Sequence, residues 1–372
     1  MRWIFILLFI STTGFAKSVE LYEEWMPDAT GEAYFVKPVD WTGSFWPHHY
    51  AIRLAIEEQG YSVRYWDRLA HLPWLLTWKG VHGWNDFLHW LGFNLPRRDA
   101  LEDETAYLIL TGIGPQIRDL NFSRIPKEKL ILFIWEPPTV QPESYDPEWQ
   151  KYFHKIYTYN DDLVDHVRFF KFYLPYLGFR TEPLVPYEER KFLTLIASRM
   201  KSHHPKELYS QREKVIRFFE DHPEEPFDLY GRYWQKFHFR NYRGTIPGDM
   251  PGKMQVLKNY KFALAYENAN INGYITEKLW DCFVLGVVPI YWGPDNITDY
   301  VPADCFIDRR RFKDDAEMLA FIQAMTKEEW EGYIERASAF LQTETAQLFR
   351  TENYARTIGD AISHSTMQKP SS

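Results

Sequence analysis

The feature that most constrains the fold is an alternation of short apolar runs with an amphipathic run in the second half of the chain. "KFALAY" at 261–266 and "VVPIYW" at 287–292 have the length and the β-branched and aromatic content of buried strands. Between them, residues 276–285 follow the period of an amphipathic helix. Its apolar face carries Leu279, Cys282, Phe283 and Gly286 at spacings of three and four residues. A strand, a helix and a second strand in this order predict a parallel sheet with a crossover helix.

The same alternation runs through most of the chain and predicts an α/β protein made of two Rossmann-like halves. Further strands are expected at 61–66, 106–112, 129–135, 155–159, 191–198 and 227–231. Helices are expected at 49–59, 206–221 and 253–260, and another after the capping box of Thr326 and Glu329. Open parallel sheets bind ligands beyond the carboxyl ends of their strands. We therefore expect the two halves to face each other across a ligand-binding cleft.

Length and local composition suggest where the domains begin and end. A chain of 372 residues is longer than one typical domain, and Gly178, Pro183 and Pro186 indicate a linker. The apolar run after Arg2 is typical of a signal peptide or a short anchor. We expect a signal-like or anchor segment at 1–16, an N-terminal α/β domain at 17–178, a linker at 179–190, a C-terminal Rossmann-like domain at 191–345 and a C-terminal helix with a disordered tail at 346–372.

Composition excludes several classes of protein. The net charge of −8 and the short basic runs argue against nucleic acid as a partner, because binding to phosphates needs clustered Lys and Arg. Two cysteines, Cys282 and Cys305, cannot form a disulfide framework or a CxxC metal site, and two buried free thiols are expected unless the chain is exported. Aromatic residues reach 18%, so the Trp-rich segment from Trp74 to Trp90 could either pack a core or stack on sugar rings.

Candidate site residues lie in the polar stretch "ENANINGYITEK", which separates the strand at 261–266 from the helix at 276–285. Thr276 suits an N-cap, whereas Lys278 places a cation where the helix dipole is positive, at a cost of about 0.3–1 kcal/mol. A bound phosphate or diphosphate would reverse the sign of that interaction. A solvated lysine remains an equal alternative. Arg212 and Arg199 are candidates for the further cations that a diphosphate needs.

Other motifs favour ordinary structural roles. The doublets His48-His49 and His203-His204 do not suit one metal ion, because adjacent side chains usually point apart. "YNDD" at 159–162 fits a helix N-cap better than an acidic metal-binding triplet. Two sequons, at Asn121 and Asn296, would matter only in a secreted protein.

Residues 260–308, with Phe-Ala-Leu, Glu-Asn, Tyr-Ile-Thr-Glu-Lys, Gly-x-Val-Pro-Ile and Gly-Pro in order, resemble the signature region of family 10 glycosyltransferases, the α-1,3/1,4-fucosyltransferases. The resemblance covers most of 190–345 and extends more loosely to "LFIWEPPTV" at 132–140. It implies the two-domain GT-B architecture, with GDP-fucose bound by the C-terminal half and the acceptor by the N-terminal half. The reaction it implies inverts the β-linked fucose of the donor to an α-fucoside.

The resemblance also assigns roles to individual residues. The catalytic carboxylate of the family maps onto Glu136, which follows the apolar strand at 129–135. The donor-binding residues map onto Arg212, Glu267, Asn268, Tyr274, Glu277 and Lys278. The resemblance implies no required metal or other cofactor, although a divalent cation such as Mn²⁺ often stimulates members of the family.

The expected function is that of an α-1,3-fucosyltransferase acting on an oligosaccharide or glycoconjugate that contains N-acetylglucosamine or glucose. Two alternatives stay open: a transferase that uses another GDP-sugar such as GDP-mannose, and a catalytically degenerate protein that binds a sugar or a nucleotide. The N-terminal segment predicts membrane association or the secretory pathway, or the cytoplasmic face of a membrane in a bacterium. The cysteine-rich C-terminal end of animal members is absent.

Overall fold

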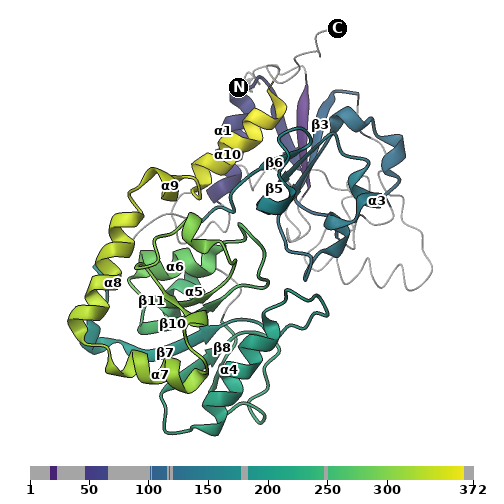
Figure 1. Ribbon diagram of the computed structural model, residues 1–372. Helices are drawn as coiled ribbons and strands as arrows, with labels where there is room; N and C mark the ends of the chain where they lie inside the picture. Colours follow the sequence, from purple (N-terminus) through teal and green to yellow (C-terminus); the bar gives the residue numbers. More distant parts are fainter. Residues whose placement is uncertain are drawn as a thin grey trace, which may run out of the picture.

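The computed structural model describes residues 17–22, 47–65, 101, 103–114, 117, 120–176, 183–246 and 250–363. Two parallel six-stranded sheets form the centres of two halves, which Figure 1 shows in the upper and lower parts of the molecule. This arrangement confirms the predicted α/β fold. The segments 1–16 and 66–100, and with them Trp74 to Trp90, lie outside the described residues.

The first sheet has the strand order β2-β1-β3-β4-β5-β6, and all its pairings are parallel. Its strands are β1 (Ser18–Tyr22), β2 (Ser62–Tyr65), β3 (Thr105–Leu110), β4 (Leu130–Ile134), β5 (Lys155–Thr158) and β6 (Phe169–Lys171). Helix α1 (Pro47–Glu58) confirms the helix expected at 49–59, and the short helix α3 (Pro147–Gln150) precedes β5.

The second sheet has the order β12-β11-β10-β7-β8-β9, so β10 lies between β11 and β7. Its strands are β7 (Lys191–Ile196), β8 (Phe227–Tyr230), β9 (Tyr242–Gly244), β10 (Tyr260–Tyr266), β11 (Val288–Trp292) and β12 (Ile307–Asp308). Helices α4 (Tyr209–Asp221), α5 (Met250–Leu257) and α6 (Glu277–Leu285) connect them. The order reverses between β7 and β10, where a doubly wound sheet opens a crevice for ligands.

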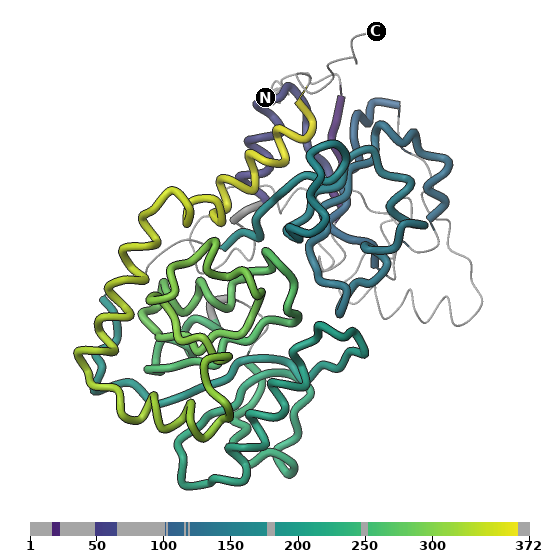
Figure 2. The backbone as a smooth tube through the Cα atoms, viewed as in Figure 1, coloured from purple at the N-terminus to yellow at the C-terminus, as the bar shows by residue number. Residues whose placement is uncertain are grey.

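The C-terminal helices join the two halves. Helices α7 (Asp315–Ala324) and α8 (Lys327–Phe340) belong to the second half, and after α9 (Glu344–Gln347) helix α10 (Thr351–Ile362) returns to the first half. There α10 packs against α1, as Figure 2 shows in yellow and purple. Tyr354 and Ile358 of α10 are buried in the same core as Ile52 and Ile56 of α1.

Several element boundaries differ from the predicted ones. The helix expected at 253–260 runs instead from Met250 to Leu257, and the side-chain Nδ2 of Asn259 caps its end by donating to the carbonyl of Gln255 at 2.6 Å. Gly286 is not part of the helical face of α6. It is the left-handed C-cap of that helix, with φ 63°. The strands β1, β6, β9 and β12 were not predicted, and three of them are edge strands of two or three residues whose pairing is set by their neighbours.

Other local predictions are confirmed. Thr326 and Glu329 form the expected capping box of α8, and Asn160 of "YNDD" caps a 3₁₀ helix at Asp161–Leu163. Cys282 and Cys305 are buried and free.

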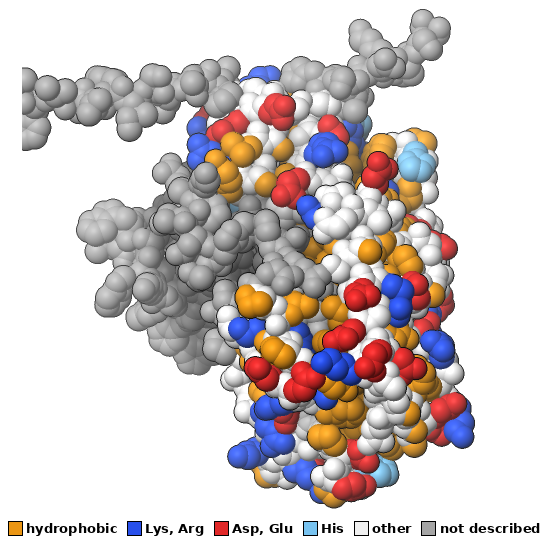
Figure 3. All heavy atoms as spheres, turned by 90° about the vertical axis from the view of Figure 1, so that its left-hand side faces the viewer, with side chains coloured by type: hydrophobic (Ala, Val, Ile, Leu, Met, Phe, Trp, Pro, Cys, Tyr) orange, Lys and Arg blue, Asp and Glu red, His pale blue; other side chains and the backbone are white. Residues whose placement is uncertain are grey.

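No helix in the described ranges is long and apolar enough to cross a membrane. On the face that includes α8, acidic and basic side chains are interspersed and no broad basic surface is seen (Figure 3).

Candidate active site

The polar stretch after β10 forms a loop that ends at the N-terminus of α6. Glu267 follows the last residue of β10, and Thr276 is the N-cap of α6, accepting from the backbone N–H of Lys278 at 3.4 Å. We call residues 268–276 the donor loop. The expected helix start at this point is confirmed.

Glu267 supports the donor loop from inside the protein. Its side chain has no exposed surface, and its carboxylate accepts hydrogen bonds from the backbone N–H of Thr276 at 2.8 Å and from its hydroxyl at 2.7 Å. The hydroxyl of Tyr291 donates to the same carboxylate at 3.1 Å. These bonds occupy much of its accepting capacity. The structure therefore places Glu267 behind the loop, and its contact with a donor sugar stays a prediction.

Lys278 is a nearly buried cation in the first turn of α6. Its Nζ lies 3.3 Å from Glu267 Oε2 and 3.4 Å from Glu277 Oε1, and it donates to Thr276 Oγ1 at 3.0 Å. Burial opposes its charge, but the two glutamates outweigh that effect and raise the pKa of Lys278. Burial likewise opposes the charge of Glu277, while Lys278 and Lys253 hold the pKa of Glu277 well below its ordinary value. These carboxylates offset the unfavourable helix dipole without a bound anion.

Arg212 is held against the end of β10. Its guanidinium donates to the carbonyl of Tyr266 through Nε at 3.2 Å and through Nη2 at 2.6 Å. Nη2 also donates to Asn268 Oδ1 at 2.8 Å, which fixes the first residue of the donor loop. Arg212 is 4% exposed, and Nη1 has no hydrogen-bond partner among the described residues. That N–H edge remains available for an anionic ligand.

Glu136 comes from the first half, where Trp135 separates it from the end of β4 at Ile134 and Pro137 follows it. Burial raises the pKa of this partly buried carboxyl to about 7; Lys278 acts in the opposite direction, and Glu277 and Glu267 raise it further. The hydroxyl of Tyr145 donates to the backbone carbonyl of Glu136 at 3.1 Å. A carboxylate with this pKa can accept a proton near neutral pH.

Tyr274 of the donor loop lies near both Glu136 and Arg212. It is 2% exposed, and burial, Glu136 and Glu267 together raise the pKa of its hydroxyl well above the ordinary value. That hydroxyl has no hydrogen-bond partner among the described residues, so a ligand can receive its proton. The ring of Tyr274 packs against Tyr159 of the first half, with 4.7 Å between ring centroids.

The structure thus brings the predicted site residues into one cluster between the halves. These are Glu136, Arg212, Glu267, Asn268, Tyr274, Glu277 and Lys278. Arg199 is not part of it, because it pairs with Glu213 at 3.0 Å and stacks on Trp234. His204 accepts from the backbone N–H of Lys206 at 3.2 Å, as a structural histidine does.

Sequence reasoning missed a buried pair behind the cluster. Lys253 of α5 lies 2.7 Å from Asp281 Oδ2 and 3.4 Å from Glu277 Oε1. Asp281 is 3% exposed, and burial raises its pKa although Lys253 opposes that shift. The available signal was a single acidic residue in a predicted helix whose other residues from 279 to 285 are all apolar, because buried charges require a partner. Lys253 thereby approaches the same oxygen of Glu277, Oε1, as Lys278 does.

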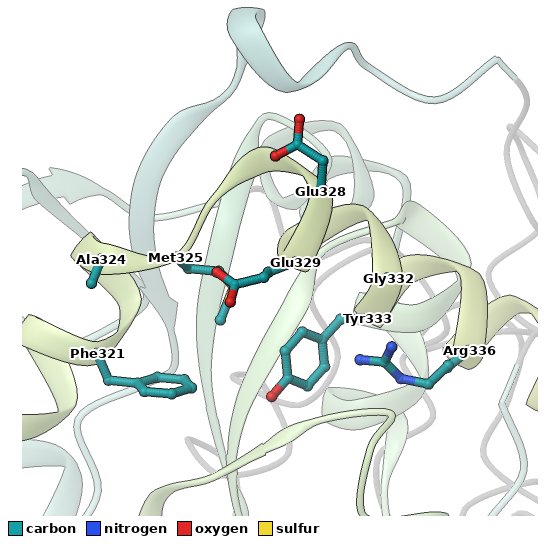
Figure 4. Close-up of a pocket in the computed structure, with 8 residues that line it drawn as sticks. All are labelled: Phe321, Ala324, Met325, Glu328, Glu329, Gly332, Tyr333 and Arg336. Carbon is teal, nitrogen blue, oxygen red and sulfur yellow. The ribbon is translucent and has the colours of Figure 1, made fainter.

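Two other features do not contribute to the cluster. In the part of the chain that the structure describes, no group of three or more His, Cys, Asp or Glu side chains is arranged to hold a metal ion. A groove of about 340 Å³ lies between α7 and α8, lined by Phe321, Met325, Tyr333 and Arg336 among others (Figure 4). None of its lining residues belongs to the cluster.

Comparison with known proteins identifies the class of fold and then a family match over part of the chain. Two α/β halves with a site between them form a GT-B glycosyltransferase fold. Two solved structures share this fold, each with a TM-score of 0.50. An α1,3-fucosyltransferase with GDP is 14% identical over 95% of this chain and 91% of its own. An α-glucosyltransferase in complex with UDP and DNA is 11% identical over 93% of this chain and 99% of its own.

Residues 187–351 match the glycosyltransferase family 10 (fucosyltransferase) C-terminal domain. The predicted resemblance to family 10 is therefore confirmed over this part of the chain. GDP-fucose protein O-fucosyltransferase 3 of Bos taurus is 40% identical over 90 residues, 23% of this chain and 19% of its own length. The 4-galactosyl-N-acetylglucosaminide 3-α-L-fucosyltransferase 9 of Mus musculus is 28% identical over 211 residues, 55% of this chain and 51% of its own. The chain thus matches between a fifth and a half of these relatives.

Proposed function

We propose that this protein transfers L-fucose from GDP-fucose to an acceptor hydroxyl, with inversion at the anomeric carbon. The observation that carries the proposal is that the carboxylate of Glu136, from the first half, lies near enough to the nearly buried cation Lys278 of the second half for Lys278 to lower its pKa. A base for the acceptor and cations for a leaving diphosphate are the two requirements of a single displacement. The family 10 match over residues 187–351 supports the donor.

In the proposed reaction the diphosphate of the donor lies at the N-terminus of α6. Lys278, Nη1 of Arg212 and the hydroxyl of Tyr274 would donate to its oxygens. The acceptor oxygen attacks C1 of fucose from the face opposite the diphosphate and loses its proton to Glu136. The bond between C1 and the phosphate oxygen breaks, and its electron pair leaves with GDP. Closure of the site between the halves excludes water, which would otherwise hydrolyse the donor.

For the acceptor we propose first a glycan containing N-acetylglucosamine or glucose, fucosylated in α-1,3 linkage. The similarity to the murine 3-α-L-fucosyltransferase 9, which covers 55% of this chain, supports this acceptor. A protein hydroxyl is the second candidate. It is favoured by the 36–42% identity of this chain to GDP-fucose protein O-fucosyltransferase 3 over 73–112 residues.

Release of GDP by the purified protein tests the proposal. We would supply GDP-fucose alone, with N-acetyllactosamine and with a folded secreted protein domain, and GDP-mannose in parallel. Release from GDP-fucose that an acceptor stimulates supports a fucosyltransferase and distinguishes the two acceptors. Release from GDP-mannose alone identifies a different donor. GDP binding without release from either donor, measured by calorimetry, would contradict the transfer reaction and leave a nucleotide-binding protein.

A further inference from the structure

We propose that Asp161, in the first half, is a positioning residue for the donor loop of the second half. It would hold the backbone at Gly273 and thereby place Tyr274 for the diphosphate. The expected effect on donor binding rests on the proposed function. The contacts of Asp161 with the donor loop do not depend on that function. The consequence is that the second half does not complete its own donor site: a carboxylate of the acceptor-side half is needed.

The carboxylate of Asp161 is the centre of a hydrogen-bond network between the halves. From the second half, Asn296 Nδ2 donates to its Oδ2 at 2.7 Å and the hydroxyl of Tyr300 reaches both oxygens at 2.7 Å. From its own half, Lys171 Nζ lies 2.6 Å from Oδ1. Asp161 is about a quarter exposed, with a side-chain value of 27%. Hydrogen bonds to an ionised acceptor of this kind are stronger than neutral ones.

The network continues directly into the donor loop. Asn296, which Asp161 orients through Nδ2, accepts the backbone N–H of Gly273 on its Oδ1 at 3.0 Å. The backbone N–H of Asp161 itself donates to the carbonyl of Asn272 at 3.2 Å. The single peptide unit between Asn272 and Gly273 is therefore held at both of its polar atoms: its carbonyl oxygen by Asp161 directly, and its N–H through the amide of Asn296.

Gly273 shows how closely the first half approaches this backbone. Its φ of 79° is left-handed, a conformation that glycine adopts without strain. A Cβ at this position would lie 2.2 Å from the carbonyl oxygen of Tyr159, 2.6 Å from Lys171 Nζ and 2.9 Å from Asp161 Oδ2. All three atoms belong to the first half. The loop thus passes against a fixed surface centred on Asp161.

The apolar residues of the loop also pack into the first half. Ala269, Ile271 and Tyr274 are buried in the same hydrophobic cluster as residues of β1, α1 and β4. This packing sets the general position of the loop, and the polar network sets its local backbone. It also assigns Asn296 a structural role, so the sequon "NIT" has its asparagine engaged on both polar atoms.

Binding of GDP to the full-length protein, measured by calorimetry, tests the inference. Asp161→Asn removes the charge but little volume, and we expect it to raise the Kd for GDP about tenfold. Asn296→Ala breaks the same path and should have a similar effect. Because both act through one path, the double variant should also show about a tenfold loss, not a hundredfold one. A Kd within twofold of wild type for Asp161→Asn, or additive losses in the double variant, would overturn the inference.

Asp165→Asn is the matched control. Asp165 has the same charge, lies four residues further on, and accepts at 2.8 Å only from backbone N–H groups of its own turn. We expect wild-type GDP binding from it. Deuterium uptake of the peptide covering 268–276 in the unliganded protein is a second readout. Asp161→Asn should accelerate this uptake and Asp165→Asn should not, whereas unchanged uptake would contradict the positioning role. If wild type binds no GDP, the proposed function fails and this exchange measurement still decides the role of Asp161.

Discussion

The pH dependence of turnover is the most informative prediction. Burial raises the pKa of Glu136 from its ordinary value of 4.5 to about 7. A base must be deprotonated to act, and kcat/KM reports the pKa of the free enzyme. We therefore expect kcat/KM to be level above pH 8 and to fall as pH decreases, reaching about a tenth of the plateau at pH 6. If the carboxylate had its ordinary pKa, kcat/KM would not change between pH 6 and pH 8.

Two substitutions should move this pKa in opposite directions. Lys278 lowers the pKa of Glu136 and Glu277 raises it. Lys278→Met should therefore shift the acid limb of the profile to higher pH, whereas Glu277→Gln should shift it to lower pH. We expect both changes also to weaken donor binding, so the test is the pH at which kcat/KM falls and not the height of its plateau.

The assay is GDP release from GDP-fucose at constant ionic strength, with the acceptor that gives the highest stimulation, between pH 5.5 and about 9. Glu136→Gln is the control: it should keep GDP binding, lose most of the turnover, and show no limb near pH 7. A wild-type profile that is flat between pH 6 and 8 would refute Glu136 as the base. Shifts of the same sign in both charge variants would refute the electrostatic cluster.

Three further outcomes follow from the same geometry. Lys278→Ala should raise the Kd for GDP about tenfold to a hundredfold, measured by calorimetry, because it removes a charged donor from the N-terminus of α6. Gly273→Ala should destabilise the protein by at least about 2 kcal/mol in urea unfolding, since its Cβ would overlap the carbonyl of Tyr159. Lys253→Met should cost about 3 kcal/mol by leaving Asp281 buried without its cation. The double variant Lys253→Met with Asp281→Asn should recover part of that loss, and no recovery would contradict the pairing.

The parts of the fold that could be predicted from the sequence are those specified by local patterns of hydrophobic and capping residues. The strand expected at 261–266, the helix from Thr276 and the capping box at Thr326 are each specified by residues within one short window. Hydrophobic period and capping chemistry act at that range. The edge strand β12 has only two residues, and its position is set by pairing with β11, so no local pattern identified it.

The candidate site was predictable where chemistry lies in one stretch and not where it is assembled from distant ones. Tyr274 and Lys278 belong to one polar run, so their proximity follows from the sequence. Asp161 and Asn296 are 135 positions apart, and nothing local marks either as a partner of the other. A charged residue on a polar turn could pair with many surface groups or with water. Only the contact between the two halves determines that Asp161 pairs with Asn296.

The arrangement of charges gives the proposed reaction a further property. Burial raises the pKa of Glu136, Lys278 lowers it, and the negative neighbours Glu277 and Glu267 raise it further. As the bond between fucose and the diphosphate breaks, negative charge grows on the departing phosphate beside Lys278. That charge acts on Glu136 in the same direction as Glu277 does, and it also screens the effect of Lys278 on the carboxylate. Glu136 therefore becomes a stronger base as the leaving group departs, so that acceptance of the acceptor proton and loss of GDP promote each other across the two halves.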